Sequence, residues 1–241
     1  MNTLVTRGLR KFSTKTFMIK EQQQFMHTAT EHVNERFDIL QKMIDCEFMY
    51  KFRLSYNKDS GERGSCIAYR AIHGKEFKPS CGGIVLDPTI EMQEIEAMAG
   101  INKFRNAMMG IPFSGSMGGI AVNPSLHSEK EIYSMMQSYA RELNEREYVG
   151  AYKDVISIDS HTKDTTRQAI IDSFLLYHQK EKQKYACVLG KPLEHKGIAG
   201  SQVNEDLGIL NVINYILGNI DLCKSYNIYP GLKNRRVFVC V

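Results

Sequence analysis

The sequence has none of the short cysteine and histidine spacings that bind zinc. It contains neither a C-x-x-C nor an H-x-x-x-H pair, and its cysteines lie far apart. Because structural zinc sites draw on ligands at such spacings, no metal site is predicted. Free thiols in a reducing compartment are the expected state of the six cysteines. They are Cys46, Cys66, Cys81, Cys187, Cys223 and Cys240.

Long apolar runs and nucleotide-binding glycine motifs are also missing. No apolar stretch approaches the roughly 20 residues that span a bilayer, so no transmembrane segment is predicted. Neither G-x-G-x-x-G nor G-x-x-x-x-G-K-[ST] occurs, and these motifs shape the loops that bind dinucleotide and nucleotide phosphates. We therefore expect this chain to bind no nicotinamide cofactor by itself.

Acidic residues are absent from the first twenty positions. This stretch carries five basic residues, several hydroxyl side chains and scattered apolar ones, and the first acid is Glu21. Such a composition is typical of a mitochondrial transit peptide, and a basic N-terminal extension is the alternative for residues 1–20. The expected location is the mitochondrial matrix, including the matrix side of the inner membrane as a peripheral subunit.

An excess of charge of either sign is also missing beyond the N-terminus. The formal net charge of the chain is +4, and the basic leader accounts for that excess. The rest is close to neutral, which argues against a broad basic face for nucleic acid. No nucleic-acid partner is expected.

Apolar periodicity predicts alternating helices and strands. Residues 21–50 carry apolar side chains at helical spacing, from Val33 to Phe48, and predict one long amphipathic helix. Residues 51–72 alternate around the turn NKDSGERG and predict a β-hairpin. Further helices are expected after Pro88, after a Ser128–Glu131 capping box, near 170–175 and over 207–220. With a strand at 154–158, this pattern indicates the α/β class.

Two further segments stand out, one rich in glycine and one continuously apolar. IPFSGSMGGIAVNP, at residues 111–124, places three glycines around Met117 and predicts a loop whose backbone approaches a ligand closely. VFVCV, from Val237 to Val241, has the continuous apolar character of a buried parallel strand. We expect it to pair within the same domain or with a partner chain, since an unpaired strand edge invites association.

Four segments, in order, resemble the glutamate dehydrogenase family over roughly residues 30–241. FRLSY…YRAIHGKEFKPSCGGI is similar to the family's hairpin and first glycine-rich turn, and EIEAMAGINKFRNAMMGIPFSGSMGGIAVNP to its helix, strand and second glycine-rich loop. EREYVGAYKDVISIDSHT resembles the segment that ends in the catalytic aspartate. YACVLGKP…GIAGS resembles the entry to the coenzyme domain.

The resemblance implies a fold and a division of the chain. Residues 21–200 are expected to form the family's N-terminal substrate-binding domain, a three-layer α/β unit with a mixed sheet. Residues 201–241 are expected to be a linker helix and the orphan first strand of a Rossmann domain, before which the sequence is truncated.

The resemblance also assigns roles to the glycine turns. The family catalyses the reversible oxidative deamination of glutamate with a nicotinamide cofactor and relies on three lysines. The carboxylate-binding lysine beside the first Gly-Gly pair, Gly82 and Gly83, corresponds to Cys81. A second carboxylate-binding lysine corresponds to Arg105.

The remaining positions carry the family's chemistry. The catalytic lysine between the glycines corresponds to Met117, and the aspartate proton shuttle to Asp159. An arginine and a threonine of the family correspond to Ser201 and Glu205. The residues present are thus implied to be vestigial, with Cys81, Arg105, Gly82, Gly83 and Ser201 marking the former substrate-binding site.

These substitutions differ in their chemical consequences. An arginine still pairs with a carboxylate, although its planar fork differs from the point charge of a lysine. A thiol supplies no positive charge, and a thioether offers neither a donor nor useful basicity. Asp159, without its lysine partners, is expected to accept backbone N–H groups or to cap the next helix. The histidines are expected to be structural.

The sequence therefore favours a pseudoenzyme derived from an amino-acid dehydrogenase. It is expected to serve as an accessory subunit of a large mitochondrial assembly, with a homologous dehydrogenase-like chain among the possible partners. A respiratory complex is favoured over a ribosome because the chain is near neutral beyond its leader. The alternatives are a subunit of an active dehydrogenase whose coenzyme domain lies on a second chain, and a non-catalytic amino-acid or keto-acid binding module.

Overall fold

The computed structural model describes residues 14–33, 35, 37–74, 76–159, 162–178, 180, 183–201, 203–233, 235 and 236. The first thirteen residues of the predicted leader and the predicted strand at 237–241 lie outside the described residues, as does His161.

Helices and strands alternate along the described chain. The helices are α1 Thr14–Thr30, α2 Phe37–Ile44, α3 Met92–Met108, α4 Glu129–Glu145, α5 Asp164–Tyr177, α6 Asn204–Gly218 and α7 Ile220–Ser225. The strands are β1 Phe48–Asn57, β2 Arg63–His73, β3 Ser80–Gly82, β4 Ile84–Leu86, β5 Ser114–Ile120, β6 Asp154–Ser157 and β7 Val188–Leu189. Short 3-10 turns lie at Pro124–Leu126, Lys184–Cys187 and Leu193–His195.

The strands form one mixed sheet in the order β1-β2-β5-β3-β6-β7, with β4 also paired to β5. The β1–β2 hairpin is antiparallel, as predicted, and β2 pairs antiparallel with β5. The other pairs, β3 with β5, β4 with β5, β3 with β6 and β6 with β7, are parallel. The parallel half therefore directs the carboxyl ends of β3 and β6 toward the same edge of the sheet.

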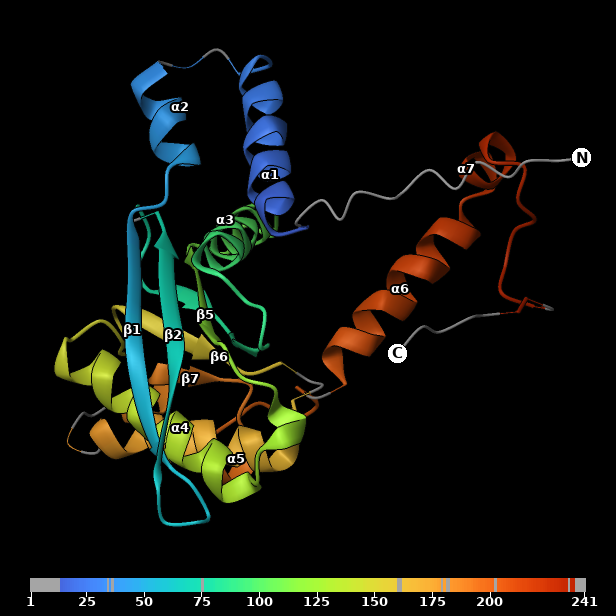
Figure 1. Ribbon diagram of the computed structural model, residues 1–241. Coiled ribbons are helices and arrows are strands. Elements are labelled where there is room, and N and C mark those ends of the chain that lie inside the picture. The colour runs from blue at the N-terminus through green and yellow to red at the C-terminus, as the bar shows by residue number, and fades with distance from the viewer. Residues whose placement is uncertain are drawn as a thin grey trace, which may run out of the picture.

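Helices cover both faces of this sheet (Figure 1). Helix α3 packs on β5 and β2 and carries α1 on its outer side, whereas α4 and α5 pack together on the opposite face. This is the predicted three-layer α/β arrangement.

Helix α4 shows how the sequence pattern builds the core. The Ser128 hydroxyl accepts the Glu131 N–H at 3.2 Å and so caps the helix, as predicted. All six residues predicted to face inward are buried: Ile132, Met135, Met136, Tyr139, Ala140 and Leu143. They join Phe52, Leu54 and Phe174 in the larger apolar cluster of the domain.

The single long helix predicted over 21–50 is wrong. Helix α1 ends at Thr30, α2 covers Phe37–Ile44, and the chain has entered β1 by Phe48. Phe48 pairs with Ile72 in the hairpin, and its ring lies 4.5 Å from that of Tyr148. These cross-strand and ring contacts, far apart in sequence, override the helical spacing of the apolar residues.

The loop predicted around Met117 is also wrong, because this segment is β5, a central strand with all seven residues buried. Its glycines admit neighbouring groups of the fold instead of a ligand. A Cβ on Gly115 would lie 2.1 Å from the Ala99 carbonyl oxygen of α3, and one on Gly118 would lie 2.3 Å from the Tyr139 hydroxyl. The missing side chains let α3 and the core close on the strand from both faces.

Helices α6 and α7 extend away from the sheet (Figure 1). The predicted helix over 207–220 is confirmed up to Gly218, and Asn219 caps the separate α7. No residue of α6 is buried, although the helix is rich in leucine and isoleucine. Within the described part of the chain, no helix has the length and apolar character needed to cross a membrane.

Candidate functional site

A break in one strand shapes the candidate site. Strands β3 and β4 run along the same edge of β5 and are separated only by Gly83. The Gly83 carbonyl accepts the Gly118 N–H at 2.9 Å, which holds the break against β5. The backbone of Gly82 and Gly83 is thereby fixed at the rim of a cleft.

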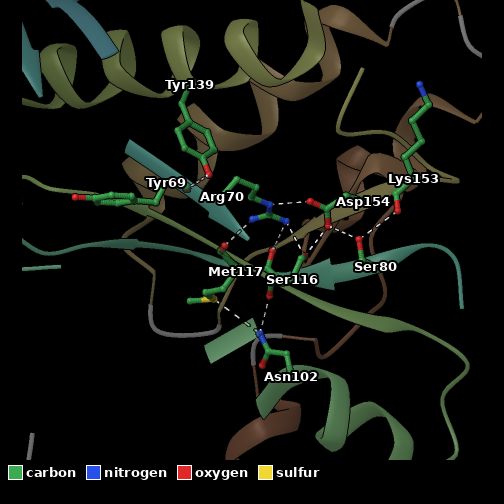
Figure 2. Close-up of polar contacts among 11 residues, drawn as sticks. Tyr69, Arg70, Ser80, Asn102, Ser116, Met117, Tyr139, Lys153 and Asp154 are labelled. Atoms are coloured by element: carbon green, nitrogen blue, oxygen red, sulfur yellow. Dashed lines mark hydrogen bonds and ion pairs between the residues drawn. The ribbon is translucent and has the colours of Figure 1, made fainter. Parts of the chain in front are cut away.

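Arg70 of β2 supports this break from the opposite side of β5 (Figure 2). Its Nη1 donates to the Gly83 carbonyl at 2.9 Å, and its Nη2 donates to the Gly82 carbonyl at 3.4 Å. Its Nε pairs with Asp154 Oδ2 at 2.7 Å, and neither side chain is exposed to solvent. Arg70 sits opposite Gly118 in the β2–β5 register, and the absent side chain of Gly118 leaves room for the guanidinium.

Two serines complete the partners of Asp154. Its Oδ1 accepts from the Ser116 hydroxyl at 2.6 Å and from the Ser80 hydroxyl at 3.0 Å, while Ser116 Oγ also accepts from Arg70 Nη2. The buried charges are therefore paired and hydrogen-bonded on all sides. Sequence reasoning missed this network. The signal for this network in the sequence was a charged residue within one apolar run, SCIAYRAI, and another at the start of a second, DVISI.

The cleft beside the break has a volume of about 710 Å³. Strands β3, β4, β5 and β6, helix α3, the segment after β6 and the first turn of α6 contribute its walls. It brings together most residues that the sequence singled out, with the exception of Ser201. The lining residues are Cys81, Gly82, Gly83, Val85, Met98, Ile101, Asn102, Arg105, Asn106, Met117, Ser157, Asp159, Thr162 and Glu205.

Met117 forms part of the cleft wall while packing into the fold. Its side chain is 9% exposed and belongs to an apolar cluster with Ile95 and Ala99 of α3. Asn102 Nδ2 lies 3.8 Å from its sulfur. The Met117 methyl and Asp159 Oδ2 lie 3.8 and 3.9 Å from the position that a Cβ on Gly83 would occupy. The thioether and the carboxylate thus both lie close to Gly83.

Asp159 is exposed and follows the end of β6. The next helix, α5, has Lys163 as its N-cap residue, so the prediction that Asp159 caps this helix is wrong. The backbone turns at this point, with the Thr162 N–H donating to the Asp159 carbonyl at 3.1 Å. This turn leaves the carboxylate on the cleft wall.

Positive charge in the cleft comes from one described side chain. Arg105, in the last turn of α3, is the one lysine or arginine among the described lining residues, and it is exposed. Burial, together with the negative charge of Asp154, raises the pKa of the Cys81 thiol to about 11. Cys81 is therefore a neutral thiol at physiological pH and offers a substrate carboxylate no cationic partner.

None of the histidines that the structure describes lines this cleft. His73 is buried, and its Nε2 contacts the Ile44 carbonyl at 2.9 Å, in keeping with the predicted structural role. His178 is buried at the end of α5. Across the residues that the structure describes, no group of three or more His, Cys, Asp or Glu side chains could hold a metal ion.

Together, the three layers, the interrupted strand and the adjoining cleft are consistent with a dehydrogenase dimerisation domain. A sequence profile of the Glu/Leu/Phe/Val dehydrogenase dimerisation domain matches residues 47–175, more than half of the chain. The chain belongs to the Glu/Leu/Phe/Val dehydrogenase family.

Individual relatives agree with this assignment. The chain is 24% identical over 215 residues to the mitochondrial glutamate dehydrogenase of Dictyostelium discoideum, covering 89% of this chain and 43% of the relative. It is 30% identical over 178 residues to glutamate dehydrogenase A2 of Halobacterium salinarum, covering 73% of this chain and 41% of the relative. The chain thus spans less than half the length of these two proteins.

Solved structures show the same fold. The Leu-bound hetero-hexameric glutamate dehydrogenase of Thermus thermophilus matches with a TM-score of 0.74 and 21% identity, over 91% of this chain and 50% of that one. Glutamate dehydrogenase of Peptoniphilus asaccharolyticus matches with a TM-score of 0.73 and 21% identity, over 88% of this chain and 51% of that one.

The position of Met117 on the cleft wall predicts that a lysine there is tolerated with little loss of stability. In Met117→Lys, the aliphatic stem can keep the packing of the methionine while the ammonium reaches the open cleft near Asp159. We expect the free energy of unfolding to fall by about 1 kcal/mol or less. Met135→Lys is the matched control, because Met135 is fully buried in the core. It should lower the melting temperature far more, and equal losses would contradict an open cleft at Met117.

Proposed function

We propose that this chain is a catalytically inactive member of the dehydrogenase family. The observation that carries the proposal is that Met117, a thioether, lies on the cleft wall. The resemblance expects the catalytic lysine at this position. A thioether can neither polarise a carbonyl nor move a proton. The loss of a general acid–base group and of an electrostatic group typically costs about 10²–10⁴-fold in rate for each.

The residues at the expected substrate-binding positions support the same proposal. The neutral thiol of Cys81 lies where the resemblance expects a lysine, so a dicarboxylate substrate meets one cation, Arg105, instead of several. Asp159 remains on the wall, but its family role is to exchange protons with a lysine-activated substrate. A carboxylate alone does not supply the missing electrophilic group.

We further propose that the chain is an accessory subunit of a mitochondrial assembly, a respiratory complex in preference to a ribosome. Two features support this: the basic, acid-free leader and the unburied apolar surface of α6. Exposed apolar surface on such a scale commonly marks a protein–protein contact. One relative, from Dictyostelium discoideum, is itself named as mitochondrial.

A turnover assay tests inactivity. The chain, isolated with the proteins that co-purify with it, is expected to show no glutamate-dependent reduction of NAD⁺ or NADP⁺ above background. Asp159→Asn is expected to leave that background unchanged. Robust turnover that Asp159→Asn abolishes would overturn the proposal and favour a dehydrogenase subunit whose coenzyme domain lies on another chain.

The retained cleft favours a second candidate, a non-catalytic amino-acid or keto-acid binding module. Its volume of about 710 Å³ and the exposed guanidinium of Arg105 suit a small carboxylate. Calorimetry with glutamate and 2-oxoglutarate separates this candidate from a purely structural role. Saturable heat that Arg105→Gln removes would identify a binding module, and no heat at millimolar ligand would dismiss it.

A further inference from the structure

A second cavity of about 440 Å³ lies on the other side of the molecule, between the tip of the β1–β2 hairpin and helices α4 and α5. Figure 1 shows these three elements side by side at the end of the domain remote from α1 and α2. None of its lining residues lines the cleft, so this cavity is independent of the function proposed above.

One face of helix α4 is polar and lines this cavity. Ser134, Gln137, Ser138 and Arg141 follow one another at i, i+3, i+4 and i+7 on α4, so they share one face of that helix. The Ser134 hydroxyl accepts the Asn57 N–H of the hairpin at 3.0 Å, which ties α4 to the hairpin and leaves the serine proton free to donate.

Two arginines from different elements also line this cavity. Arg141 comes from α4, and Arg63 comes from the first position of β2, next to the hairpin turn. In the described part of the chain neither arginine forms an ion pair. The carboxylate beside Arg141, Glu142, instead contacts Tyr50 and Arg146. No acidic residue is among those lining the cavity.

Ser173 of α5 supplies an independent sign of a missing ligand. Its side chain is 1% exposed and lines the cavity, yet its hydroxyl has no hydrogen-bond partner. A buried hydroxyl without a partner costs stability, so such groups are usually satisfied by water or by a ligand. A ligand oxygen in the cavity would satisfy it.

We propose that this cavity binds a phosphate group, either as free phosphate or on a small phosphorylated metabolite. Two unpaired guanidinium groups and several hydroxyl donors match the charge and the multiple acceptor oxygens of a phosphate. The absence of a carboxylate from the lining argues against an amino acid, whose ammonium group would need one. The volume exceeds that of phosphate alone and leaves room for the rest of a metabolite.

Calorimetry of the full chain with inorganic phosphate and phenyl phosphate tests the proposal, with sodium acetate as a monocarboxylate control. We expect saturable binding of phosphate and none of acetate. Tighter binding of phenyl phosphate would indicate a phosphorylated metabolite, and equal or weaker binding would indicate free phosphate. Arg63→Gln and Arg141→Gln should each raise the Kd by about tenfold or more. Ser173→Ala should also weaken binding while leaving the melting temperature of the free protein equal or higher.

Arg53→Gln is the matched control, because Arg53 is an exposed arginine on the same hairpin that does not line the cavity. It removes the same charge and should leave the Kd within about twofold. The proposal is overturned if millimolar phosphate gives no saturable heat, or if Arg53→Gln weakens binding as much as the two cavity arginines do.

Discussion

Replacing Arg70 with methionine is expected to lower the free energy of unfolding by about 3–5 kcal/mol. The substitution leaves the Asp154 carboxylate buried without its cation and removes the donors that hold the Gly82 and Gly83 carbonyls. Chemical denaturation followed by circular dichroism measures the loss. If the variant does not fold, its failure agrees with the expectation, and Arg70→Lys, which keeps the charge without the fork, should recover part of the stability.

The Arg146–Glu142 ion pair is the control that shows how burial changes the stability contributed by such a pair. Its N–O distance is also 2.7 Å, but both side chains are substantially exposed to solvent. Arg146→Met should therefore cost far less than Arg70→Met, because solvent screens the surface pair and can solvate the carboxylate left behind. Similar losses in the two variants would mean that burial does not determine the contribution of Arg70.

Gly82→Ala should also destabilise the domain strongly, by about 3 kcal/mol or more. The new Cβ would lie 1.6 Å from the Ser116 carbonyl oxygen, a backbone atom of β5 that cannot move without breaking the β3–β5 pairing. The shift would also displace the Gly82 carbonyl from Arg70. Thermal denaturation measures the loss.

Gly208→Ala is the matched control for the same added methyl group. Gly208 lies within α6, and nothing surrounds the position of its Cβ within 4 Å. Because alanine favours the helix over glycine by up to about 1 kcal/mol, this variant should be neutral or slightly stabilising. A melting temperature of Gly82→Ala equal to that of the parent would contradict the close contact at the strand break.

Local patterns predicted much of the fold. The β1–β2 hairpin follows from alternation around a glycine-containing turn, and the inward face of α4 from apolar residues at helical spacing. In both cases the signal lies within a short window of sequence. The resemblance to a family supplied the three layers and the mixed sheet, which periodicity alone does not specify.

Long-range contacts account for what the sequence did not predict. Strand β5 contains three glycines, which disfavour strands by themselves, and it is stable because helices and neighbouring strands close on it. Arg70 and Asp154 are 84 residues apart, so no spacing rule links them. Within the site, the resemblance predicted positions that converge on the cleft, but Ser201 lies outside its lining. Asp159 was expected to accept backbone N–H groups or to cap the next helix; the N-cap position of α5 is Lys163, which makes no side-chain cap, and the first alternative stays a prediction.

Arg70 supports the strand break beside the cleft. The residues that give this support are different from those that would contact a molecule bound in the cleft. Arg70 reaches the cleft through the Gly82 and Gly83 carbonyls, Asp154 and Ser116 in turn bind its guanidinium, and none of the three lines the cleft. Cys81 and Met117, on its walls, take no part in this hydrogen-bond network. Selection for a stable fold alone would preserve the hollow over evolutionary time, whether or not anything in it reacts.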